Sequence, residues 1–208
     1  MDKYAIYALG FFAQALFGGR LLVQLFYSEK QGKVVSPTIF WLLSLMASFA
    51  FLIYGVLRDD IIILIGQTLS YYIYIRNLQL KHDWQKFPLI ARVILVPLPF
   101  ILLGWMSYNS PHSLSTILGK SDFTHILLVL GAIGQLLLNL RFVYQWYYSE
   151  KAKTSVLPFG FWLISTVASV LVIAYALYKM DPVLLVAQSM GIIVYVRNMF
   201  LKNKGTAE

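Results

Sequence analysis

The 208-residue chain is 59% hydrophobic and 12% charged, whereas soluble domains average roughly 45–50% and 25%. A globule of this length cannot bury so much apolar surface, so a soluble fold is excluded and lipid must cover part of the chain. The formal charge of +8 does not indicate nucleic acid, because the basic residues stand at the ends of apolar runs. We predict an all-α integral membrane protein.

Seven apolar runs can be followed along the chain, at about 5–27, 37–57, 61–80, 88–106, 125–148, 159–178 and 183–201. Each has about 20 residues, enough to cross a hydrocarbon core of about 30 Å as a helix. Pro97 and Pro99 lie inside the fourth run and predict a kink there. The first run could be mistaken for a signal peptide, but its start is barely basic and the same segment recurs inside the chain.

The chain contains an internal duplication. The stretch from Gln14 to Lys30 returns 121 positions later as Gln135 to Lys151, and pairing 4–81 with 125–202 gives 27 identities in 78 positions. The fourth run has no counterpart, so the pattern is 3 + 1 + 3 helices. We predict a first triple-helix repeat at 1–81, a connector with the fourth helix and a periplasmic loop at 82–124, and a second repeat at 125–208.

The connector and the basic residues predict the orientation. One intervening crossing returns the chain to its starting side, so the two repeats should be parallel. Eleven basic residues fall on one side of the seven runs and four on the other. The positive-inside rule then places the N-terminus outside and the C-terminus in the cytoplasm.

Polar side chains form stripes on the first and third helices of each repeat. On a helical wheel they fall within arcs of about 120° and about 80°, and such stripes must face protein or water rather than lipid. On the first helices the stripe residues are Gln14, Arg20, Gln24, Gln135, Arg141 and Gln145. On the third helices they are Gln67, Tyr74, Asn77, Gln188, Tyr195 and Asn198. The second helices add Trp41 and Trp162.

The arginines admit two interpretations. A central arginine costs about 2.5–3.5 kcal/mol to insert, and it can be tolerated if it snorkels to the interface or pairs with Glu29 or Glu150. Alternatively, Arg20 and Arg141 converge on a phosphate or carboxylate, which suits two guanidinium forks better than a neutral sugar does. The glutamines could be interhelical glue or a binding groove. The tryptophans could be anchors or core residues rather than ligand stackers.

The other polar residues indicate no reaction chemistry. Arg76 and Arg197 point away from the stripes on their helices and are expected to be cytoplasmic anchors. The chain has no cysteine, nucleotide-binding loop, Ser/His/Asp set or carboxylate cluster. We therefore expect no enzymatic activity, no cofactor and no bound metal.

The repeated pattern Q-x5-R-x3-Q-x3-SEK, followed by P-x2-FW-x2-S and Y-x-RN, resembles the N-terminal domain family of lipid-A-disaccharide synthases. It occurs from Gln14 to Asn77 and from Gln135 to Asn198. That family is similar to SWEET and PQ-loop transporters. The resemblance implies a SWEET-like fold in which Asn77, Asn198, Trp41 and Trp162 line a central site.

The resemblance also implies a bacterial inner-membrane protein near lipid A metabolism. Together with the arginines it favours a flippase for a polyisoprenyl-phosphate sugar or aminosugar, such as one carried on undecaprenyl phosphate. Its expected partners are membrane lipids and the lipid-linked sugar phosphate, and a lipid A glycosyltransferase is a further candidate partner. Two alternatives stay open: a SWEET-like carrier of a soluble sugar or anion, and a non-transporting scaffold for such a glycosyltransferase.

Overall fold

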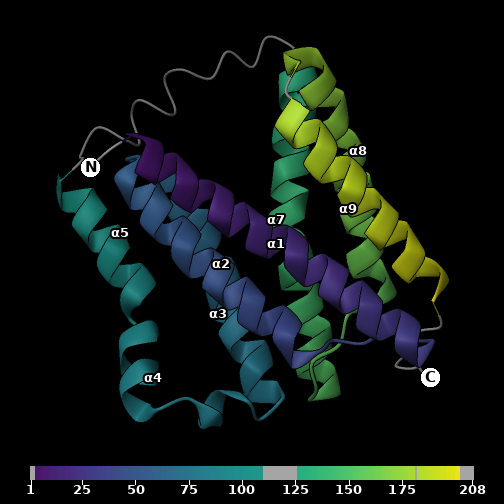
Figure 1. Cartoon of the computed structure of the whole chain (residues 1–208), viewed down its shortest axis with the longest axis horizontal. Coiled ribbons are helices and arrows are strands. Elements are labelled where there is room, and N and C mark those ends of the chain that lie inside the picture. The colour runs from purple at the N-terminus through teal and green to yellow at the C-terminus, as the bar shows by residue number, and fades with distance from the viewer. Residues whose placement is uncertain (1–2, 110–125, 181, 202–208) are drawn as a thin grey trace. The chain divides into compact units, whose positions relative to one another are not determined.

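The computed structural model describes residues 3–109, 126–180 and 182–201, and every regular element in these ranges is helical (Figure 1). The elements are α1 (Lys3–Gln31), α2 (Thr38–Leu57), α3 (Ile61–Leu80), the short 3-10 helix η1 (Trp84–Lys86), α4 (Leu89–Leu95), α5 (Leu98–Asn109), α7 (Ile126–Ala152), α8 (Phe159–Lys179) and α9 (Pro182–Phe200). The all-helical prediction is therefore confirmed, and each predicted run coincides with a helix or, for the fourth run, with two.

Helix boundaries follow local chemistry that recurs in both halves of the sequence. Helix α8 begins directly after Pro158, whose backbone is extended. The residues just after α1 and α7 adopt left-handed conformations, at Gly32 (φ 63°) and Lys153 (φ 53°). The residues after α2 and α8 do the same, at Asp59 (φ 52°) and Met180 (φ 54°). A left-handed residue just past the last turn is a common helix stop.

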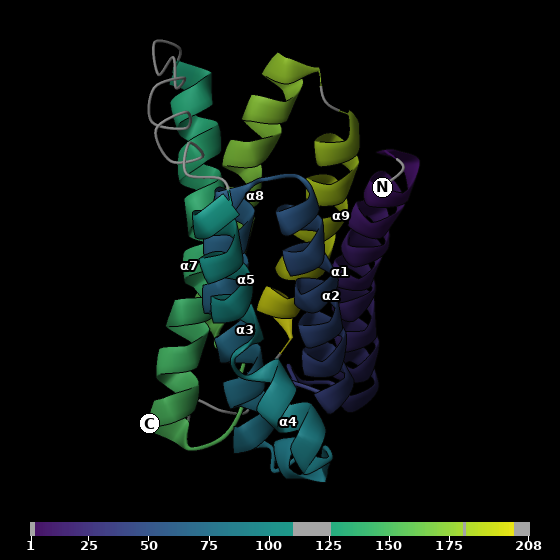
Figure 2. The ribbon, with the colours of Figure 1, turned by 90° about the vertical axis from the view of Figure 1, so that its left-hand side faces the viewer.

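The fourth apolar run is broken as the prolines predicted. The run is interrupted between α4 and α5, at Val96 and Pro97. Pro99 has no N–H to offer the carbonyl of Leu95, four residues earlier. The Tyr71 hydroxyl donates to that carbonyl at 3.0 Å, and the Tyr72 hydroxyl donates to the carbonyl of Val96. Two tyrosines of α3 thus satisfy the backbone that the break leaves open, and Figure 2 shows α3 and α5 side by side.

Four helical segments are long and apolar enough to cross a membrane: 4–31, 38–57, 89–109 and 159–179. The chain therefore has the helices of a membrane protein. Helix α3 is less apolar because it carries Gln67, Arg76 and Asn77. The crossings predicted for α3, α7 and α9 stay predictions.

The chain divides into two compact units, and α1 contributes to both. The first unit comprises Met1–Gly19 and Trp41–Ser121, and the second comprises Arg20–Phe40 and Asp122–Glu208. In the second unit, α8 packs against both α7 and α9 (Figure 1). Because the second unit includes the α1 residues from Arg20 onward, the two predicted stripe arginines belong to the same unit.

Contacts within each unit recur at the 121-residue offset. A Cβ built on Gly10 would lie 2.8 Å from the Tyr54 ring, and one on Gly131 would lie 2.5 Å from the Tyr175 ring. Both glycines thus allow a helix to approach a tyrosine too closely for any side chain. Two further pairs repeat: Ser48 to Gln67 (3.0 Å) with Ser169 to Gln188 (2.8 Å), and the Trp41–Tyr74 ring pair (6.1 Å) with the Trp162–Tyr195 pair (6.1 Å).

Candidate anion-binding site

The two predicted arginines are buried in the second unit and share one aromatic ring. Arg20 of α1 is 4% exposed and Arg141 of α7 is 7% exposed. The guanidinium carbon of each lies 5.1 Å from the centroid of the Phe142 ring. Twice that distance is the largest separation the two carbons can have, so two positive charges lie close together in a region with little access to water.

Aromatic rings surround both guanidinium groups. Arg20 also lies 5.4 Å from the Phe40 ring, and Arg141 lies 5.4 Å from the equivalent Phe161 ring. The Tyr195 ring is 5.3 Å from Arg141. Such cation–π contacts are worth about 0.5–1 kcal/mol each at exposed sites and about 2 kcal/mol when desolvated. They offset part of the cost of burying the charges without neutralising them.

Not every N–H group of Arg141 has a hydrogen-bond acceptor. Its Nη1 donates to Ser165 Oγ at 3.0 Å, and the Ser165 hydroxyl donates in turn to the carbonyl of Phe161 at 2.6 Å. Its Nε is buried and has no hydrogen-bond partner among the described residues. None of the described carboxylates lies within ion-pair distance of Arg141. A buried, unsatisfied donor costs about 1–3 kcal/mol, and more when it is charged.

A second buried donor nearby also lacks a partner. Trp162 is fully buried on α8, and its indole Nε1 finds no acceptor among residues 3–109, 126–180 and 182–201. Its ring packs against Phe161 at 4.9 Å and against Tyr195 at 6.1 Å. Trp162 and Arg141 therefore contact the same Tyr195 ring, and each carries an N–H group that an incoming acceptor could satisfy.

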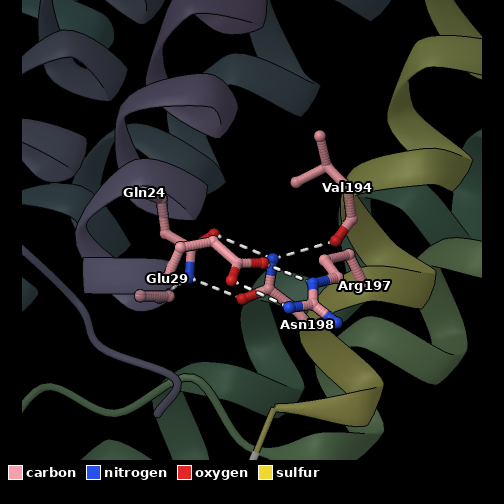
Figure 3. Close-up of polar contacts among 6 residues, drawn as sticks. Gln24, Glu29, Val194, Arg197 and Asn198 are labelled. Atoms are coloured by element: carbon pink, nitrogen blue, oxygen red, sulfur yellow. Dashed lines mark hydrogen bonds and ion pairs between the residues drawn. The ribbon is translucent and has the colours of Figure 1, made fainter. Parts of the chain in front are cut away.

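Toward the end of α1, two polar pairs join this helix to α9 (Figure 3). Gln24 donates to Asn198 Oδ1 at 2.8 Å, and Asn198 donates back to Gln24 Oε1 at 3.0 Å. Beyond them, Arg197 donates through Nε and Nη2 to the two carboxylate oxygens of Glu29, the second bond measuring 2.8 Å. The amide pair is buried and the ion pair is exposed to solvent.

The glutamines also tie each first helix to the loop that follows it. Gln24 donates to Ser28 Oγ at 2.8 Å and to the carbonyl of Val35 at 3.2 Å. The equivalent Gln145 donates to Ser149 Oγ at 2.7 Å and to the carbonyl of Val156 at 2.8 Å. Each amide thus fixes a loop as well as a helix, which favours the glue interpretation for these two glutamines.

The remaining predicted site residues lie in different surroundings. Gln14 and Gln135 are exposed. Gln67 and Gln188 are half-buried and accept bonds from the serines of the neighbouring helices. Trp41, Tyr74 and Asn77 are buried in the first unit, where Asn77 donates to the carbonyl of Ile73 at 2.9 Å.

Sequence reasoning missed two features of the site. The phenylalanines around the guanidinium groups were not singled out, although Phe40 and Phe161 are identical in the two copies. The pairing of Glu29 with Arg197 was also missed, since Glu29 was considered as a partner of Arg20 and Arg197 as an anchor. Like the phenylalanines, Glu29 and Arg197 belong to motifs that recur in the two copies. That recurrence was the one signal in the sequence that could have pointed to them.

Comparison with known proteins matches most of both copies of the duplicated region. The family model described as the Lipid A Biosynthesis N-terminal domain matches residues 9–79 and again residues 130–200. The chain is 27% identical to a lipid-A-disaccharide synthase of Chlamydia pneumoniae over 95% of its length, and 28% identical to that of Chlamydia muridarum over 96%. It spans 33% and 34% of those two proteins. No solved structure matches the chain.

Proposed function

Because the chain belongs to the family of the Lipid A Biosynthesis N-terminal domain, we propose that it translocates a lipid-linked sugar phosphate used to modify lipid A or another envelope glycan. The observation that carries this proposal is the buried pair Arg20 and Arg141 on the shared Phe142 ring. Family membership supplies the link to lipid A, and the arginine pair supplies the class of ligand.

The charge of the pair favours an anion over a neutral sugar. Burying an ion costs several kcal/mol even after the protein relaxes, and like charges add repulsion. Arg141 has no acidic partner within ion-pair distance among the described residues. A phosphate would neutralise charge and accept the unused N–H group, whereas a neutral hexose would do only the latter. We therefore assign the phosphate to the arginines.

The proposed topology is seven crossings arranged as two parallel repeats joined by the fourth helix, in a bacterial inner membrane, with the N-terminus periplasmic and the C-terminus cytoplasmic. The duplication and the one-sided distribution of basic residues support it. In this arrangement the phosphate sits at the arginines and the isoprenyl chain remains in lipid. Rocking of the repeats would alternate access to the site.

A reconstituted system tests the proposal. Purified protein in vesicles is given a fluorescent short-chain isoprenyl phosphohexose, and transfer to the opposite leaflet is followed by quenching from outside. Arg20→Lys and Arg141→Lys keep the charge but lose the bidentate fork, and each should slow transfer at least about tenfold. Arg58→Lys is the matched control, because Arg58 is exposed beside the Tyr7 ring.

Full transfer in the Arg20→Gln/Arg141→Gln double variant would contradict the anion site. A soluble hexose or hexose phosphate that is transported while the isoprenyl compound is not would instead support a SWEET-like carrier. Both outcomes can be read from the same vesicles.

A second candidate function is a membrane scaffold for a lipid A glycosyltransferase. The observation in its favour is that the relatives are lipid-A-disaccharide synthases, of which this chain spans about a third. In a scaffold the arginines would brace helices, so Arg→Lys should be almost silent. Retention of a lipid A glycosyltransferase on the purified protein, without transfer in vesicles, would favour this function. In neither candidate does the chain itself catalyse a reaction.

A further inference from the structure

We infer that Arg141 and Trp162 form a composite site for a sugar phosphate, in which Arg141 binds the phosphate and the Trp162 indole N–H binds a sugar oxygen. The inference rests on the proposed function and specifies its ligand. Both side chains are buried, and both contact the Tyr195 ring, at 5.3 Å and 6.1 Å. Nε of Arg141 and Nε1 of Trp162 each lack an acceptor within the part of the chain that the structure describes.

The surroundings of Arg141 restrict how a ligand can approach it. The Phe142, Phe161 and Tyr195 rings all lie within 5.4 Å of the guanidinium carbon. Ser165 accepts from one of the two N–H groups of Nη1, and its own hydroxyl proton is used on the Phe161 carbonyl. Among the N–H groups that this bond leaves unused, Nε is buried and lies on an in-plane edge of the guanidinium together with one terminal nitrogen. An edge of this kind pairs with two oxygens of one phosphate or carboxylate.

Trp162 supplies a different kind of recognition. The indole N–H is a neutral donor that cannot accept a hydrogen bond or gain a charge. It is suited to a hydroxyl or ring oxygen, while the phosphate is drawn to the arginine. Because a site built around a hydrogen bond rejects ligands that lack the partner atom, this pair should prefer a sugar phosphate to phosphate alone. Soluble and lipid-linked sugar phosphates share this chemistry.

Binding to the purified 208-residue protein tests the pair. The probes are inorganic phosphate, a hexose 1-phosphate and a short-chain isoprenyl phosphohexose, each titrated by calorimetry. Arg141→Lys should weaken binding of all three. Trp162→Phe should weaken the two sugar-bearing probes about tenfold, the effect of one lost hydrogen bond, and leave inorganic phosphate unchanged. Trp146→Phe is the control, because the indole of Trp146 is exposed and donates to Glu150 at 3.0 Å.

A second measurement uses the unaltered protein, in case Trp162→Phe does not fold. Within a series of monodeoxy hexose 1-phosphates, removal of the one oxygen that faces Trp162 should cost about tenfold in affinity. Tighter binding of the isoprenyl probe than of the hexose 1-phosphate supports a lipid-linked ligand, and equal affinities support a soluble one at the same site.

The composite site is overturned if Trp162→Phe weakens inorganic phosphate and the sugar phosphates equally, or weakens none of them. The proposed function survives that result as long as Arg141→Lys still loses phosphate. Unchanged phosphate binding in Arg141→Lys would overturn the anion site and the proposed function together.

Discussion

Gln24 and Asn198 exchange two hydrogen bonds, of 2.8 Å and 3.0 Å, although 174 residues separate them in the sequence. Both amides are buried, and each has a further bond to a local carbonyl, at Val35 and Val194. This pair joins the end of α1 to α9. The candidate anion site and this α1–α9 junction both lie in the second unit.

The first prediction concerns the energy of this amide pair. Asn198→Ala should lower the free energy of unfolding by about 1–3 kcal/mol, because the Gln24 amide is left buried without that partner. The double variant Gln24→Leu/Asn198→Leu should lose less than the sum of the single changes, since neither amide is left buried without the other. Chemical denaturation of protein in detergent measures both values. Asn139→Ala is the control, because Asn139 bonds a carbonyl of its own helix. Strictly additive effects would contradict the pairing.

The burial of the arginines could be predicted from the sequence, but the exposure of Gln14 and Gln135 could not. Gln14 falls on the same helical arc as Arg20, yet Gln14 is exposed and Arg20 is buried. A helical wheel gives only the direction in which each side chain points from the helix axis. It ignores which part of the protein lies beside the helix at each level along that axis. Helix α1 passes from the first unit to the second between Gly19 and Arg20, so residues on one arc meet different surroundings.

The contact of Phe142 with the arginines could not be predicted for a different reason. Phe142 contacts both arginines, but its counterpart in the first copy is Leu21, so the duplication does not mark it. Likewise, the bond between Gln24 and Asn198 joins the first copy to the second. Comparison of the two copies shows which residues are identical. It does not show contacts between residues that are not equivalent in the copies, because those contacts depend on how the helices pack.

The second prediction uses the left-handed residues that follow α1 and α7. Gly32 adopts its positive φ at no steric cost, but Lys153 at the equivalent position must strain its Cβ. Lys153→Gly should therefore stabilise the protein by up to about 1 kcal/mol, and Gly32→Ala should destabilise it by a similar amount. Thermal unfolding of the purified variants measures both. Lys151→Gly, within α7, should be destabilising instead. A loss of stability in Lys153→Gly would contradict the prediction, because the positive φ at Lys153 would then carry no cost that glycine relieves.

The third prediction tests the proposed orientation. The chain has no cysteine, so single cysteines can be placed without background. A membrane-impermeant thiol reagent added to intact spheroplasts should label Asn109→Cys but not Gly205→Cys. After permeabilisation both should be labelled, which controls for reactivity. The reverse pattern would invert the topology and place the basic side in the periplasm.

The last prediction separates translocation from scaffolding by locking α1 to α9. Glu29 and Arg197 form an exposed ion pair, so cysteines at both positions can be joined by a short bifunctional thiol reagent. If transport requires the two helices to part, crosslinked Glu29→Cys/Arg197→Cys should stop transferring the isoprenyl phosphohexose while still binding it. Each single-cysteine variant, treated in the same way, should keep its transfer rate. A scaffold needs no such movement, so it should retain its glycosyltransferase equally well before and after crosslinking. Unimpaired transfer by the fully crosslinked protein would exclude movement at this junction from the mechanism.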